Sequence, residues 1–317
     1  MRVTTARNTK GHAIMPAHPS LYPDLPMLEG VLLGFACFAA YAISDAFVKA
    51  VHGGVPPYES VFFGGLLGLV ALPFVRDKGD RWHDVFRARR PALWWVRALA
   101  GAVGNIASVT AFTLLPMAEV FSMIFLMPIF VTILSVLLLK EHVGWRRWTA
   151  VLVGFAGVLV VLRPGFRTLG LGHAAAIVCG ITAALSVVAM RMAGSDEKRM
   201  SLYGAGTIGP LVAGGVLMLP HFVWPDLQQC LLLAGYGLLA ALAGVLLMHA
   251  TLLAPANRVA PTQYSQMLWA IAFGYWFFGN RLDWPMLVGI VMILGAGLFT
   301  LVREEKMTGW WKRARML

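Results

Sequence analysis

Ten apolar segments joined by short polar connections constrain the fold of this chain more than any other feature of its sequence. Most of them approach the roughly 20 apolar residues that a helix needs to cross a hydrocarbon core of about 30 Å. Because lipid offers no hydrogen-bonding partner to backbone N–H and C=O groups, each segment is predicted to be an α-helix. The sequence therefore predicts an all-α membrane protein with ten transmembrane helices. The segments cover approximately residues 28–48, 58–75, 92–114, 118–139, 147–162, 170–191, 201–220, 228–253, 258–279 and 284–302.

The composition supports this class. Hydrophobic residues make up 59% of the chain, charged residues 13%, and the mean hydropathy is +0.72, whereas soluble domains are about 45–50% apolar and about 25% charged. The net charge of +11 does not predict nucleic-acid binding, because Lys and Arg are scattered between apolar segments rather than gathered on one folded face. Cys37, Cys179 and Cys230 lie in or beside apolar segments without a metal-ligand spacing. We therefore predict no disulfide, no metal site and no cofactor.

The second half of the chain repeats the plan of the first at a distance of 139 positions. In each half, a proline precedes an apolar segment, a short turn ends it, and a tryptophan opens the next segment. Five helices per copy is an odd number, so the second copy is predicted to cross the membrane in the opposite sense, as an inverted repeat. The equivalent pairs are Pro116 and Pro255, Glu119 and Arg258, Glu141 and Asn280, and Trp145 and Trp284. The predicted organisation is a disordered cytoplasmic tail (1–27), a first five-helix repeat (28–165), a second five-helix repeat (166–303) and a basic cytoplasmic tail (304–317).

This duplicated unit resembles the EamA domain of the drug/metabolite transporter superfamily. The resemblance rests on the apolar helix that ends in Lys140-Glu141-His142, on Trp145 after it, and on the Gly154-x-x-Gly157 spacing. It covers roughly residues 28–303, and the second copy departs from it where Asn280 replaces the acidic residue. The resemblance implies a secondary transporter of small metabolites that works by alternating access, and no enzymatic activity.

The distribution of Lys and Arg predicts the orientation of the helices. With the N-terminus in the cytoplasm, the basic residues of the two tails and of the cytoplasmic loops far outnumber those outside, as the positive-inside rule requires. Both termini are therefore predicted to be cytoplasmic. The cytoplasmic basic clusters are those of 2–10, 76–90, 140–147, 191–199 and 303–315, whereas the outer side receives only Lys49, Arg163, Arg167 and Arg281. Arg97 is predicted to snorkel from a helix to the cytoplasmic surface.

Polar residues inside the apolar segments are the candidates for the transport site, since such groups are costly in lipid and usually face a cavity or another helix. Asp45 is the one acidic residue well inside a segment, and Lys49 lies one helical turn later. Two interpretations stay open: an Asp45–Lys49 ion pair with a structural role, or a carboxylate that lines the transport pathway. Pro128 divides the segment 118–139 and predicts a bend, because it frees a backbone carbonyl one turn earlier.

The segment 258–279 is the most informative about a ligand. Its glutamines and aromatic residues share one helical face, which is the pattern of a wall that stacks a flat ring and hydrogen-bonds its edge; ordinary core packing is the alternative. Exposed aromatic residues at 275–278 are predicted to lie at the headgroup level. His249 and Glu119 are interpreted as a packing residue and a helix-capping residue. The predicted substrate-binding residues are Tyr41, Asp45, Asn105, Ser108, Ser122, Phe125, Gln263, Gln266, Trp269 and Phe273.

Together these features predict a secondary transporter in the inner membrane of a bacterium, acting on a small molecule as a monomer or homodimer. The aromatic and amide wall favours a flat heterocycle such as riboflavin. S-adenosylmethionine transport and export of amino acids or drugs are the alternatives within the same class. A membrane-embedded enzyme would need convergent acids, bases or metal ligands, and the sequence lacks that pattern. A receptor without transport activity would be expected to carry a soluble domain.

Overall fold

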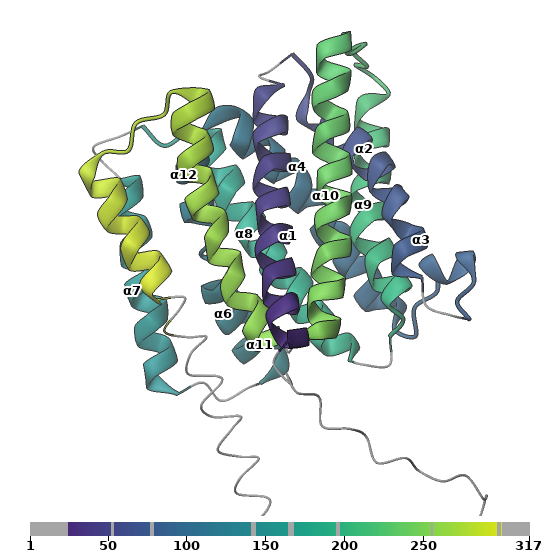
Figure 1. The fold of residues 1–317 in the computed structure, drawn as a ribbon, viewed down its shortest axis with the longest axis horizontal. Helices are drawn as coiled ribbons and strands as arrows, with labels where there is room; N and C mark the ends of the chain where they lie inside the picture. The colour runs from purple at the N-terminus through teal and green to yellow at the C-terminus, as the bar shows by residue number, and fades with distance from the viewer. Residues whose placement is uncertain are drawn as a thin grey trace, which may run out of the picture.

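The structure is a computed structural model, and it describes residues 25–51, 54–76, 79–140, 144–163, 168–194, 197–254, 256–296 and 299. The predicted tails fall largely outside these residues, as do Glu141 and His142 of the family-like motif. Within the described part the chain is helical and has no strand, which confirms the predicted all-α class (Figure 1).

Seven helical stretches are long and apolar enough to cross a membrane, and two apolar helices are shorter, at Trp148–Leu162 and Trp284–Ala296. Short connections leave little structure outside the helices. The bounds are α1 Leu25–Ala50, α2 Pro57–Gly68, η1 Leu69–Ala71, α3 Leu72–Val75, η2 Trp82–Val85, α4 Pro91–Leu114, α5 Met117–Ile124, α6 Met127–Leu139, α7 Trp145–Leu162, α8 Leu171–Ala193, α9 Arg199–Met218, α10 Leu227–Leu253, α11 Ala256–Val259, η3 Ala260–Tyr264 and α12 Ser265–Phe278.

Prolines end the helices at equivalent places in the two halves. A proline disfavours the helical conformation of the residue before it, and Leu115, which precedes Pro116, is extended at φ −123° and ψ 159°. Ala254, 139 positions later, is extended at φ −132° and ψ 146°. As a result α4 ends at Leu114 and α10 at Leu253.

The next helix ends recur at the same distance. Lys140 closes α6 in the left-handed conformation at φ 54°, and Gly279, 139 residues on, closes α12 at φ 62°. Glycine has no steric cost there, whereas a lysine side chain does. Trp145 opens α7 and Trp284 opens the final described helix. The turn chemistry that the repeat carries is thus reproduced in backbone geometry.

Equivalent points of the two halves lie at opposite ends of α1. Near the start of α1, a Cβ atom on Gly30 would lie 2.5 Å from the side chain of Ala254. Near its end, the ammonium of Lys49 donates to the carbonyl of Leu115 at 2.7 Å. Gly30 and Lys49 are about 28 Å apart along the helix at 1.5 Å per residue.

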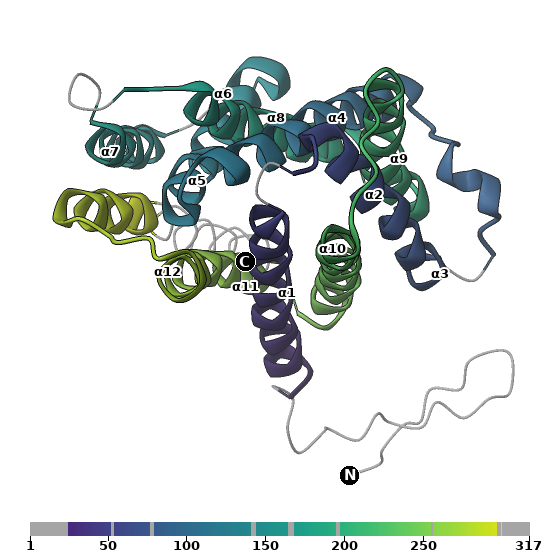
Figure 2. The ribbon, with the colours of Figure 1, turned by 90° about the horizontal axis from the view of Figure 1, so that it is seen from above.

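The two most extensive helix–helix contacts are those of α1 with α10 and of α4 with α8. Helix α1 lies along α10, and α4 lies against α8 and α9, while α2 fits between α9 and α10 (Figures 1 and 2). Helix α7 and the helix 284–296 form a pair beside this body (Figure 2). They cross closely at Gly157 and Gly289, where each glycine faces the backbone carbonyl of the other.

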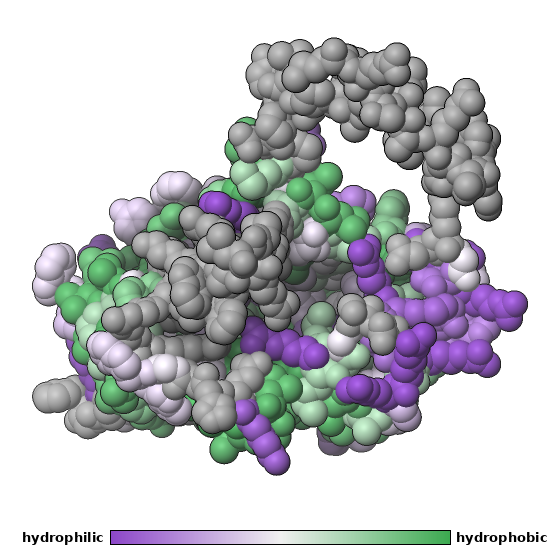
Figure 3. Space-filling model, turned by 90° about the horizontal axis from the view of Figure 1, so that it is seen from below, coloured by the Kyte–Doolittle hydropathy of each residue, from purple (hydrophilic) through white to green (hydrophobic). Residues whose placement is uncertain are grey.

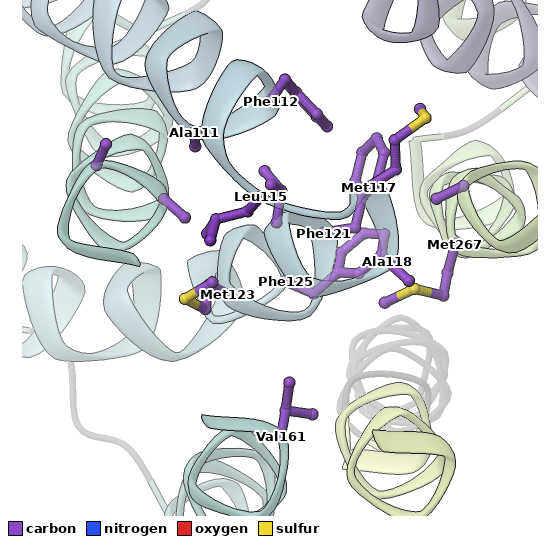
Figure 4. Close-up of a cluster of buried hydrophobic side chains, with 14 of the residues drawn as sticks. Ala111, Phe112, Leu115, Met117, Ala118, Phe121, Met123, Phe125, Val161 and Met267 are labelled. Carbon is purple, nitrogen blue, oxygen red and sulfur yellow. The ribbon is translucent and has the colours of Figure 1, made fainter. Parts of the chain in front are cut away.

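The main hydrophobic core gathers where α4 turns into α5. Phe112, Met117 and Met123 are fully buried there, and α12 adds the buried Met267 (Figure 4). The break between α5 and α6 sits just before Pro128, the first-turn proline of α6, and confirms the predicted bend. Gly180 of α8 faces the carbonyls of Met123 and Ile124 at this break, so α8 approaches the bent backbone directly.

Candidate functional site

One polar contact between the two halves joins Asp45 of α1 to Gln266 of α12. The Gln266 amide donates to Asp45 Oδ2 at 3.3 Å, and both side chains are half-buried. The contact exists because α1 packs against both η3 and α12. Gly34 permits this approach, since a Cβ there would lie 2.6 Å from the Thr262 hydroxyl.

Asp45 has no ion-pair partner among the described residues, so of the two interpretations that the sequence left open, the Asp45–Lys49 ion pair is wrong. Lys49 turns toward the end of α4 and donates to the carbonyls of Phe112 at 3.1 Å and Leu115 at 2.7 Å. Its ammonium also lies 5.3 Å from the centre of the Phe278 ring. The extended residue before Pro116 ends α4 and leaves these carbonyls without helical partners, which is why they attract the lysine.

Tyrosine rings and a thiol surround Asp45. The carboxylate interacts electrostatically with the hydroxyls of Tyr41 and Tyr236 and with the thiol of Cys179. Tyr236 is held beside α1 because the Ser44 hydroxyl donates to its backbone carbonyl at 2.7 Å. Helices α1, α8 and α10 thus each contribute one polar or aromatic group to the same region.

The α4 wall of this region carries two predicted residues. The Ser108 hydroxyl of α4 lies near the thiol of Cys179 of α8. Asn105, one turn earlier, is half-buried and donates its side-chain amide to the carbonyl of Gly101 in its own helix at 2.8 Å. Its side-chain carbonyl keeps acceptor capacity.

Arg97 extends the polar region toward α8 and α9. Its guanidinium donates to the Leu202 carbonyl of α9 at 2.8 Å and to the Ser186 hydroxyl of α8 at 2.9 Å. It also interacts electrostatically with the Tyr41 hydroxyl. Tyr41 and Tyr203 meet across Gly244, where a Cβ atom would lie within 4 Å of both side chains. Asp45 and Arg97 therefore both lie within electrostatic range of Tyr41.

Two predicted residues lie apart from this cluster. Ser122 is fully buried and donates to the Glu119 carbonyl in its own helix at 2.7 Å. Phe125 is buried in the main core, with its ring centre 5.5 Å from that of Tyr264. Both take part in packing where α5 ends, because the helix break turns this face inward.

The aromatic wall of α12 lies beyond Gln266. Trp269 and Phe273 stack with ring centres 5.7 Å apart and planes 23° apart, and Trp269 remains 38% exposed. Gln263, in η3, is half-buried. The stacked pair and Gln266 occupy successive turns on one side of α12, as the spacing predicts.

Glu119 makes a buried contact that the sequence did not indicate. Its carboxylate lies 3.0 Å from His173 Nε2, and His173 Nδ1 lies 3.1 Å from the Gly170 N–H. Since Nδ1 accepts that hydrogen bond, Nε2 carries the proton that is donated to Glu119. The pair joins α5 to the first turn of α8. His249, by contrast, is exposed and bonds within its own helix, to the Val245 carbonyl.

Sequence reasoning also missed Tyr236, Cys179 and the contacts of Arg97 with α8 and α9. A usable signal existed for Tyr236, because a tyrosine inside an otherwise apolar segment needs a partner for its hydroxyl. No comparable signal exists for Cys179, which is a common core residue.

Comparison of the chain with known proteins identifies its family. The model of the EamA-like transporter family matches residues 28–163 and again residues 170–302. The chain belongs to the EamA-like transporter family. It is therefore a transporter of the drug/metabolite transporter superfamily and a multi-pass membrane protein, not an enzyme, and it acts on a small molecule.

Curated relatives are similar over most of their length. The chain is 24% identical to an S-adenosylmethionine uptake transporter of Rickettsia prowazekii, over 88% of this chain and 94% of that one. It is 27% identical to a riboflavin transporter of Vibrio cholerae, over 76% of this chain and 85% of that one. A solved crystal structure superimposes with a TM-score of 0.60 at 18% identity, covering 88% of this chain and 98% of the other. That last similarity concerns the fold alone.

Proposed function

We propose that this chain is a secondary transporter of the bacterial inner membrane that takes up S-adenosylmethionine or a closely similar cationic nucleoside. The observation that carries the proposal is the Asp45 carboxylate, which is half-buried between the two halves and has an amide donor but no cationic partner among the described residues. A carboxylate in that position favours a ligand that brings its own positive charge.

The surrounding groups suit the other parts of this ligand. Tyr41, Tyr203 and Tyr236 offer ring faces for a cation or an adenine ring. Arg97 uses Leu202 and Ser186 as acceptors and, with its remaining donors, suits the carboxylate of an amino-acid group. S-adenosylmethionine combines a sulfonium, an ammonium, a carboxylate and an adenine ring, so it uses each of these features. The similarity to uptake transporters of that compound supports the same choice.

The proposed mechanism is alternating access between two inverted repeats of five spans each, 28–165 and 166–303. Equivalent helix ends at opposite ends of α1 support the inversion. The seven long helices, the broken helix 256–278 and the two shorter apolar helices would together make the ten spans. In such repeats the substrate binds between the halves, which then rock about it. Asp45 and Gln266 come from different halves, so one chain suffices for a site. The cytoplasmic placement of both termini follows from the Lys and Arg distribution.

The test uses purified protein in proteoliposomes loaded with S-adenosylmethionine, with counterflow of the labelled compound as the readout. We expect saturable counterflow in the wild type and a loss of about thirtyfold or more in Asp45→Asn, because a buried ligand charge would lose its partner. Glu29→Gln is the matched control, since it makes the same change at an exposed position of the same helix. Absence of counterflow with correctly inserted wild-type protein would reject this substrate.

Riboflavin is the second candidate, and the stacked Trp269–Phe273 pair beside Gln266 is the observation that favours it. A neutral isoalloxazine needs ring stacking and amide hydrogen bonds rather than a carboxylate. In the same vesicles, riboflavin transport would be reduced by Trp269→Ala and nearly unaffected by Asp45→Asn. The reverse pattern identifies the cationic nucleoside.

A further inference from the structure

A lipid-facing groove between α4 and α9 is not used by the transport site. It has a volume of about 430 Å³ and opens on the outer surface of the helices, which is within the size range of small-ligand sites. The bottom of the groove is formed where α4 and α9 cross closely at Gly209, where a Cβ atom would overlap the Ala98 carbonyl. Large exposed side chains form its walls, among them Trp95, Leu99 and Val212.

Along the helix axis, the groove is about as long as one leaflet of the hydrocarbon core is thick. Its lining on α4 extends from Pro91 to Ala102, which is roughly 16 Å along the helix axis at 1.5 Å per residue. Half of a hydrocarbon core of about 30 Å is roughly 15 Å. The lining residues are all apolar, so an acyl chain fits this space in length and in polarity.

The end of the groove near Pro91 is bordered by arginines. The segment 80–90 holds four arginines and two aspartates, and its residues Phe86 and Ala88 line the groove. Arg87, between them, is exposed, and so is Arg90, next to Pro91. Hydrophilic residues gather on this side of the lower face, next to apolar surface (Figure 3).

The acidic residues nearby are already engaged, so they do not neutralise this rim. Lys198 lies 3.0 Å from the Asp80 carboxylate and 2.6 Å from that of Asp84. The Glu197 carboxylate accepts the backbone N–H of Arg89 at 3.1 Å. These contacts hold the loop against α9, and they involve neither the Arg87 nor the Arg90 side chain.

The rim is also fixed relative to the groove. The Trp94 indole N–H donates to the Val85 carbonyl at 3.2 Å, and Arg90 Nη1 donates to the Met192 carbonyl at 2.6 Å. Arg90 therefore has donors left over for a phosphate, and arginine suits phosphate oxygens because its donors form a planar fork.

We propose that this groove binds one anionic phospholipid, with an acyl chain between α4 and α9 and the phosphate at Arg87 and Arg90. Basic pockets between transmembrane helices are known to hold anionic headgroups. This site is independent of the transported substrate and of the sense of transport. It would tie the loop 79–90 and the α4–α9 contact to the lipid composition of the membrane.

The test is native mass spectrometry of the delipidated full chain in detergent, titrated with phosphatidylglycerol or phosphatidylcholine of the same chains. We expect one tight phosphatidylglycerol and much weaker phosphatidylcholine binding. Arg87→Gln should weaken phosphatidylglycerol about fivefold, the equivalent of about 1 kcal/mol for one basic residue near an anionic surface. Arg281→Gln, an exposed arginine outside the groove, is the matched control.

A second variant tests the groove itself. Ala213→Phe fills it from α9 and should abolish the tight site, while its melting temperature in detergent shows that the protein is folded. Equal affinity for the two lipids, or unchanged phosphatidylglycerol binding in Arg87→Gln, would overturn the proposal. Competition by soluble glycerol phosphate as effective as that by the lipid would also overturn it, because it would identify a free-phosphate site.

Discussion

Lys49 holds the end of α4 through two hydrogen bonds to its last carbonyls, and Lys49→Met tests how much these bonds stabilise the fold. The ammonium is only 8% exposed and donates to two backbone carbonyls, of Phe112 and Leu115. Methionine keeps the length and the apolar stem of the side chain while it removes both donors and the charge.

The size of the effect follows from what is lost. Each hydrogen bond from a charged group contributes about 1.5–3 kcal/mol, and the two carbonyls would be left buried without partners. The positive charge at a helix C-terminus is a further favourable contribution. Relief from burying an ammonium offsets part of this loss. We therefore expect the free energy of unfolding to fall by about 2–4 kcal/mol, and the melting temperature to fall by roughly 5–10 °C.

The assay is the melting temperature of detergent-purified protein, followed by intrinsic tryptophan fluorescence at several heating rates. Lys49→Arg should recover much of the loss, because it keeps donors of similar reach. Lys140→Met is the matched control, since it removes an exposed lysine at the end of α6 and surface changes usually stay within about 0.5 kcal/mol. A Lys49→Met melting temperature that matches this control would refute the reasoning.

Two further changes test other parts of the fold. Gly209→Val should prevent the close α4–α9 crossing, because its Cβ overlaps the Ala98 carbonyl. We expect a strongly reduced yield of folded, monodisperse protein on size-exclusion chromatography. An unchanged yield and melting temperature would contradict the packing argument. The Lys198 ammonium, followed by the Arg81 N–H, lowers the pKa of the Asp84 carboxyl from 3.8 to about 2, so its contribution to stability is present above about pH 4 and is lost as the pH falls through about 2. Asp84→Asn should therefore lower the melting temperature at pH 7 and have a diminishing effect between pH 4 and pH 2, and an effect that does not depend on pH would exclude the charge pair as its cause.

The helical architecture was predictable because it depends on local signals. The length of an apolar segment indicates a transmembrane helix, and a proline indicates where it ends, so the end of α4 before Pro116 follows from neighbouring sequence alone. The bend before Pro128 was predictable for the same reason. The break of 256–278 into α11, η3 and α12 was not predicted, although Pro261 lies in the first turn of η3.

The contacts of the candidate site were less predictable because they depend on partners far along the chain. Asp45 and Lys49 are one turn apart, and periodicity alone left an ion pair between them open. The orphaned carbonyls of α4 are 63 and 66 residues away, and they compete for the lysine more effectively than the carboxylate does. A helical spacing indicates which residues can share a face, but it cannot show that a distant helix end offers a better partner.

This competition has a consequence for the transport site. Because Lys49 is held by α4, the Asp45 carboxyl has no cationic partner among the described residues, and its hydrogen-bond donor, Gln266, comes from the other half of the chain. Near the start of the same helix, Gly30 is packed against Ala254 at the end of α10. Helix α1 thus contacts the end of α10 near its own start and the end of α4 near its own end, and it lies along α10 between them. A cation bound at Asp45 would alter the Asp45–Gln266 contact, and with it the way α1 and α12 pack. In the proposed alternating access, this contact between the halves would have to change.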